Sequence, residues 1–117
     1  MCARTALCAL TALAPFAAAA SGATGERLAW RIVREHRLLT SKQLSCSVSM
    51  VREDSTQRLI KIGFYEKHDV RCGGDPSVVH RLFDLEIDVR TGRARWDNTE
   101  DLQMRPVPSR AEGARVR

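Results

Sequence analysis

The segment 81–89 carries the clearest strand signal in the chain. Apolar residues occupy every second position there, with Asp84, Glu86 and Asp88 between them: Phe83, Leu85, Ile87 and Val89. Because successive side chains of a β-strand point to opposite faces, this alternation predicts a strand with one face buried and one face in water. The four apolar residues are expected to face inward.

Three further segments are predicted to extend this strand into a small antiparallel sheet. Segment 44–50 alternates serines with residues that we expect on the buried face: Leu44, Cys46, Val48 and Met50. Segment 60–67 places Ile60, Ile62 and Phe64 on one face. After 81–89, the turn at 90–93 contains a glycine and leads into a short strand at 94–96.

An amphipathic helix is predicted over 26–39. Its apolar residues recur at spacings of three and four: Leu28, Ala29, Ile32, Val33 and Leu39. Thr24 is the expected N-cap, and Thr40 and Ser41 are expected to end the helix. The predicted fold is therefore α+β, with one N-terminal helix packed on an antiparallel sheet of about four strands.

The first 20 residues are typical of a secretory signal peptide. A short basic start precedes a run of small apolar residues that ends in Ala18-Ala19-Ala20. Cleavage is expected before Ser21, with a cut after Ala23 as the alternative. The run is too short for a membrane span and is interrupted by Pro15. We expect a periplasmic or secreted protein with a single domain at 21–101, a largely disordered tail at 102–117 and no membrane span after signal removal.

Signal removal would leave two of the four cysteines, Cys46 and Cys72. In an exported chain, two remaining cysteines suggest one disulfide, which would contribute roughly 3 to 4 kcal/mol. The formal net charge would fall from +5 to +4 through loss of Arg4. This basic balance favours anionic partners such as cell-wall polymers, but no lysine or arginine run is long enough to predict nucleic-acid binding.

Segment 66–76 is the densest in reactive residue types. A metal site would use His68, Asp69 and Asp75, with Glu66 or His80 as further ligands, because histidine and carboxylate suit zinc. The chain has no His-x-His, Cys-x-x-Cys or His-Glu-x-x-His pattern, so no metal or other cofactor is expected. A nucleophilic Cys72 would need a free thiol, which conflicts with the expected disulfide.

The leading interpretation of this segment is a turn that a disulfide attaches to the sheet. Gly73 and Gly74 permit backbone angles closed to other residues, and Asp75-Pro76 favours an extended exit. The alternative is a binding loop that a disulfide holds ready for a partner. Its candidate residues are Glu66, Lys67, His68, Asp69, Arg71 and Asp75. Trp96, on the short fourth strand, is either a core residue or an exposed anchor beside this loop.

The stretch 81–93 resembles the closing hairpin of PepSY-type domains, where a strand ends in Asp-x-x-Thr-Gly before its partner. In this chain the motif is Asp88 to Gly92. The resemblance implies a helix against a small antiparallel sheet, as in half of a cystatin-like fold, and a binding or inhibitory role. The segments 66–69, 72–76, 81–83 and 96–98 together look like a set of small exported bacterial proteins, a similarity that implies no activity.

The function expected from the sequence is an exported, non-enzymatic binding module, such as an inhibitor of a peptidase or a cell-wall hydrolase. Its partner would be an envelope protein or a cell-wall component. Two alternatives remain open. One is a small hydrolase or metal-dependent enzyme that uses His68 and Asp69, and the other is a purely structural envelope protein.

Overall fold

The structure is a computed structural model that describes residues 17–97 and 101–109. Two helices precede five strands along the chain: α1 (Ala17–Glu35), α2 (Ser41–Ser45), β1 (Ser47–Val51), β2 (Leu59–Glu66), β3 (Arg81–Asp88), β4 (Ala94–Trp96) and β5 (Arg105–Pro106). The predicted α+β fold, with a main helix on an antiparallel sheet, is confirmed. The sheet has five strands rather than about four.

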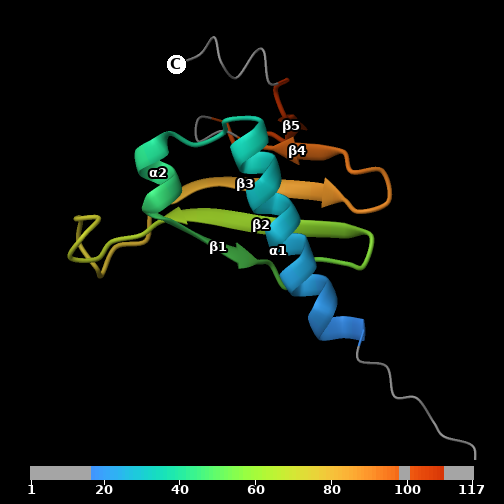
Figure 1. Ribbon diagram of the computed structural model, residues 1–117, viewed down its shortest axis with the longest axis horizontal. Helices are drawn as coiled ribbons and strands as arrows, with labels where there is room; N and C mark the ends of the chain where they lie inside the picture. Colours follow the sequence, from blue (N-terminus) through green and yellow to red (C-terminus); the bar gives the residue numbers. More distant parts are fainter. Residues whose placement is uncertain (1–16, 98–100, 110–117) are drawn as a thin grey trace, which may run out of the picture.

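The strands lie in the order β1-β2-β3-β4-β5, so each pairs with its neighbours in the sequence, and every pairing is antiparallel. Helix α1 crosses one face of this sheet, and α2 lies near the end of β2 (Figure 1). In the central pair of strands, Ile62 lies opposite Leu85 and Phe64 opposite Phe83. This register brings the apolar residues of both strands onto the face that α1 covers.

The core lies between α1 and that face of the sheet. Its buried side chains come from both layers: Ala29, Ile32, Val33, Leu39, Ile60, Ile62, Phe64, Phe83, Leu85 and Ile87. Phe64 stacks on Phe83 at a centroid distance of 4.8 Å, and Trp30 meets Phe64 edge-on at 5.0 Å. Each large side chain buried in this way contributes roughly 1.5 to 3 kcal/mol of transfer free energy. The inward residues predicted for β2 and the first three predicted for β3 are confirmed.

Val89, the fourth residue expected to face inward, is 45 % exposed. The strand ends one residue earlier, at Asp88, because the chain turns there towards β4. Asp88 accepts hydrogen bonds from the backbone N–H groups of Arg90 and Thr91, and its own carbonyl accepts one from Gly92. The turn thus removes Val89 from the alternation that precedes it.

The helix bounds differ from those predicted. Helix α1 begins upstream of Thr24, which therefore lies inside the helix, and it ends at Glu35. Arg37, just beyond that end, has a φ of 53° and takes the chain out of the helix. Thr40 begins α2 instead of ending α1, because it forms a reciprocal capping box with Gln43.

Leu44 packs against the core as predicted, but the predicted strand start and the predicted orientation of Val48 and Met50 are wrong. Leu44 belongs to α2 and Cys46 is the C-cap of that helix, so the strand begins only at Ser47. Val48 and Met50 are 41 % and 55 % exposed and lie on the sheet face that α1 does not cover. A period-two pattern shows which residues share a face, but it does not show which face is covered.

Segment 102–109, expected to be part of a tail, contributes to the fold. It supplies β5, packs Val107 against the core, and places the carbonyl of Pro108 2.7 Å from His36 Nδ1. Residues 110–117 lie outside the described residues. Most of the predicted signal peptide, residues 1–16, also lies outside them, and the expected cleavage point before Ser21 falls within α1. Among the described residues, no helix combines the length and apolar character that a membrane span requires.

Candidate functional site

A disulfide joins Cys46, at the end of α2, to Cys72, as the sequence predicted; their Cα atoms are 5.6 Å apart. Cys72 lies in the segment between β2 and β3, residues 67–80, which we call the cysteine loop. The loop extends past the end of the sheet (yellow in Figure 1). A backbone hydrogen bond from Lys67 N to the carbonyl of Cys46, at 2.8 Å, attaches its beginning to the same place.

Two aspartates organise the backbone of the cysteine loop. Asp69 Oδ1 accepts a hydrogen bond from the backbone N–H of Cys72 at 2.7 Å, and Asp69 Oδ2 lies 3.4 Å from Lys67 Nζ. Asp75 Oδ1 accepts from both the backbone N–H and the hydroxyl of Ser77. The hydrogen bond from Cys72 N lowers the pKa of Asp69, and the one from Ser77 N lowers the pKa of Asp75. Both carboxylates therefore serve as turn-forming acceptors.

Glu66, His68 and His80 form a cluster at the base of the cysteine loop. Glu66 Oε2 lies 2.9 Å from His68 Nε2 and 3.2 Å from His80 Nδ1, and the two imidazole rings meet edge-on with centroids 5.4 Å apart. Glu66 is the last residue of β2, His68 follows two positions later, and His80 directly precedes β3. The antiparallel pairing of β2 and β3 thus brings together residues from both ends of the loop.

His68 is fixed from the other side of its ring by the loop itself. Its Nδ1 lies 2.9 Å from the carbonyl oxygens of both Asp75 and Val78. Carbonyl oxygens only accept hydrogen bonds, so Nδ1 carries a proton and donates it to them. Gly74 packs against the ring so closely that a Cβ atom there would lie 2.7 Å from His68 Cδ2. Only 10 % of the His68 side chain is exposed.

The carboxylate and the imidazole shift each other's pKa in opposite directions. The hydrogen bond with Glu66, followed by that with the carbonyl of Asp75, raises the pKa of His68. The hydrogen bonds with His68 and then His80 lower the pKa of Glu66. These are the directions expected when a carboxylate and an imidazolium stabilise each other's charged form.

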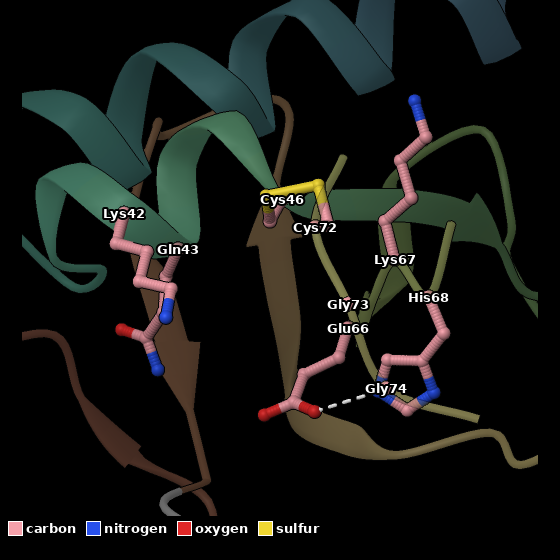
Figure 2. A pocket seen from close by; sticks show the side chains of 9 residues that line it. All are labelled: Lys42, Gln43, Cys46, Glu66, Lys67, His68, Cys72, Gly73 and Gly74. Atoms are coloured by element: carbon pink, nitrogen blue, oxygen red, sulfur yellow. Dashed lines mark hydrogen bonds and ion pairs between the residues drawn. A yellow bond between two sulfur atoms is a disulfide. The ribbon is translucent and has the colours of Figure 1, made fainter. Parts of the chain in front are cut away.

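A shallow pocket of about 270 Å³ lies between α2 and this cluster. It is lined by Lys42 and Gln43 from α2, by the disulfide, and by Glu66, His68 and the two loop glycines, among others. Figure 2 shows the Glu66 carboxylate directed at the His68 ring, while the Lys67 side chain points away from that pair. The pocket therefore presents positive, negative and neutral polar groups within a small area.

The structure brings some of the predicted site residues together and separates others. Glu66 and His68 lie in one cluster, which also includes His80, a residue that the sequence offered as a further metal ligand. Lys67 and Arg71 are exposed on the loop. Trp96 lies on the core side of the sheet, where it meets Phe83 edge-on at 5.3 Å, and it is half-buried. It does not join the cluster at the base of the loop.

Comparisons with family models, with curated proteins and with solved structures found no match. The resemblance of 81–93 to PepSY-type domains stays a prediction.

Proposed function

We propose that the protein is an exported, non-enzymatic binding module that contacts a partner protein of the cell envelope through the cysteine loop. The observation that carries this proposal is the combination of exposed apolar side chains with a fixed backbone. Val70 is fully exposed and Val79 is 73 % exposed. On a loop whose backbone is already fixed, these side chains could enter a protein contact at little cost in ordering, which favours a binding role.

The constraint on the loop is what distinguishes it from an ordinary surface connection. The disulfide, the two aspartate-centred turns and the hydrogen bonds of His68 to two loop carbonyls all fix its backbone. A loop ordered before binding loses little conformational entropy when it binds, so more of the contact energy appears as affinity. Arg71, the neighbour of Val70 in the sequence, adds positive charge, which would favour an acidic surface on the partner.

The positions of the two residues considered for an enzyme also support a binding role. His68 is paired with Glu66, whereas Asp69 is used to cap the loop backbone and to pair with Lys67. A hydrolase based on His68 and Asp69 would need both side chains directed at one reacting atom. An inhibitor of a peptidase or a cell-wall hydrolase is the form of binding module that the PepSY-type resemblance implies.

Site-specific photo-crosslinking tests this proposal. A photoreactive amino acid is placed at Val70, and the protein is exposed to envelope extract of the source cell with increasing amounts of unlabelled competitor. We expect a discrete crosslinked product that wild-type competitor removes and that a Val70→Asp, Val79→Asp competitor does not. Val89 provides the matched control, because it is an exposed valine at the opposite end of β3.

A probe at Val89 should give no saturable product, and Val89→Asp should compete as well as the wild type. Equal competition by the Val70→Asp, Val79→Asp variant would refute the proposal, as would a product at Val70 that wild-type protein does not displace. If the captured partner is a hydrolase, adding the wild-type protein should lower its activity and adding the double variant should not.

A further inference from the structure

The cluster at the base of the cysteine loop has the ligand types of a metal site. Glu66, His68 and His80 each offer one ligand atom, and the three atoms all lie within 4.8 Å of one another. Two imidazoles and one carboxylate are a ligand set that zinc accepts, with three protein ligands and a fourth position left open. Among the described residues this is the group whose geometry suits a bound ion.

The two separations that involve Glu66 are close to those found around a coordinated ion. In a tetrahedral zinc site with metal–ligand distances near 2.1 Å, neighbouring ligand atoms lie about 3.4 Å apart. Glu66 Oε2 lies 2.9 Å from His68 Nε2 and 3.2 Å from His80 Nδ1. The two histidine ligand atoms lie within 4.8 Å of each other. Opening the two Glu66 separations by a few tenths of an ångström, with the His80 ring moving towards His68, would admit the ion. The Glu66 and His80 side chains are 41 % and 63 % exposed, so both have room to make that movement.

His68 is already held in the orientation that a metal ligand needs. Its Nδ1 donates to the carbonyls of Asp75 and Val78, which leaves Nε2 as the nitrogen that faces Glu66. Metal-binding histidines typically donate their second ring N–H to a carbonyl or a carboxylate, because this fixes the tautomer and the ring plane. Gly74 gives the ring its space, since a larger residue there would collide with it. The loop thus supplies both a ligand, His68, and the carbonyls that orient its ring.

From this arrangement we propose that Glu66, His68 and His80 bind one divalent transition-metal ion, with zinc as the fitting ion. The ion takes the position of the proton on His68 Nε2 and draws His80 Nδ1 and Glu66 Oε2 around it. Because His68 and His80 stand at the two ends of the cysteine loop, the ion joins those ends in addition to the disulfide. The open fourth position faces solvent and accepts water or a side chain of a partner. This inference does not rest on the proposed function.

Zinc titration by calorimetry tests the site on the full chain carrying Cys2→Ser and Cys8→Ser, so that zinc held by thiolates is not counted. One equivalent should bind, and His80→Ala should weaken the affinity by at least about 100-fold, because loss of even an outer partner of a ligand typically costs about 10- to 100-fold. His80 is suited to the test because its exposed side chain can be truncated with little risk to folding. His36→Ala is the matched control, since His36 contacts Pro108 and lies outside the cluster.

Cobalt substitution provides a readout that depends on coordination. Co²⁺ added to the parent chain should give the intense visible absorption of a tetrahedral site, and Glu66→Gln and His80→Ala should each reduce it, while His36→Ala should not. The proposal is overturned if the parent chain binds no zinc, or if His80→Ala binds it as tightly as the parent. A zinc site lost equally in His36→Ala and His80→Ala would likewise place the metal elsewhere. None of these three results would alter the crosslinking expected at Val70.

Discussion

The indole nitrogen of Trp30 donates a hydrogen bond to Ser49 Oγ at 2.9 Å, which connects α1 to β1 across the two layers. The Ser49 hydroxyl in turn donates to the Glu26 carboxylate on the same helix. This polar contact explains why β1 directs its serines towards α1. Trp30 packs its ring against Phe64 and needs an acceptor for its N–H, and a serine on the neighbouring strand supplies one.

Ser49→Ala should lower the free energy of unfolding by about 1 kcal/mol, because the half-buried Trp30 N–H would lose its acceptor. Denaturant unfolding followed by circular dichroism measures the change. Val48→Thr is the matched control on the next residue of the strand, and since Val48 faces solvent it should change stability by less than about 0.5 kcal/mol. A larger loss from Val48→Thr than from Ser49→Ala would mean that the strand faces the other way.

Strands β2 and β3 were predictable because their apolar residues alternate without interruption and end up on the covered face. Segment 47–51 also alternates, but there α1 contacts the strand through the hydroxyl of Ser49. A prediction that places the apolar residues under the helix therefore assigns the wrong face of this strand to the core. Helix α2 and strand β5 are five and two residues long, too short for any periodicity to be recognised.

The candidate site was predictable in part for a similar reason. The density of charged and histidine residues after β2 indicated Glu66 and His68. The contact of His80 with Glu66 depends on the pairing of β2 with β3. The orientation of His68 is fixed by two backbone carbonyls of the loop, and the residue types in the sequence do not show where backbone carbonyls will lie. Register and backbone position are properties of the folded chain, so no local motif could have revealed them.

Removing the disulfide by Cys72→Ser should lower the free energy of unfolding by roughly 3 to 4 kcal/mol, because the chain between the two cysteines gains freedom mainly in the unfolded state. The sequence separation of 26 residues sets this estimate. Chemical denaturation under non-reducing conditions gives the value. Cys2→Ser with Cys8→Ser should leave the stability unchanged. A wild-type chain whose Cys72 reacts readily with a thiol reagent would contradict the pairing.

Asp97→Ala should destabilise the fold by about 2 kcal/mol. Asp97 is 4 % exposed, accepts a hydrogen bond from Asp84 N at 2.7 Å and pairs with the Arg81 guanidinium. Truncation would leave both donors without this acceptor, and a lost hydrogen bond to a charged group costs roughly 1.5 to 3 kcal/mol. Thermal unfolding compares the variant with Asp101→Ala, which removes an exposed partner of Arg105 and should cost at most about 0.5 kcal/mol. Similar losses in the two variants would contradict the role given to Asp97.

The pKa of Asp54 should rise when Lys61 is replaced by methionine. The hydrogen bond from Lys61 Nζ, at 2.8 Å, is the largest cause of the lowered pKa of Asp54, and the hydrogen bond from Arg52 adds to it against the opposing effect of desolvation. Because the folded-state pKa lies below the unfolded-state value, this carboxylate contributes stability that is fully present above about pH 4. That contribution is lost as the pH falls through the lower, folded-state pKa.

Carbon-detected NMR titration of the Asp54 carboxyl group should show its midpoint moving towards the ordinary value in Lys61→Met. Lys42→Met, which removes an exposed lysine from α2, should leave it in place, and an unmoved midpoint in Lys61→Met would show that Lys61 does not set this pKa.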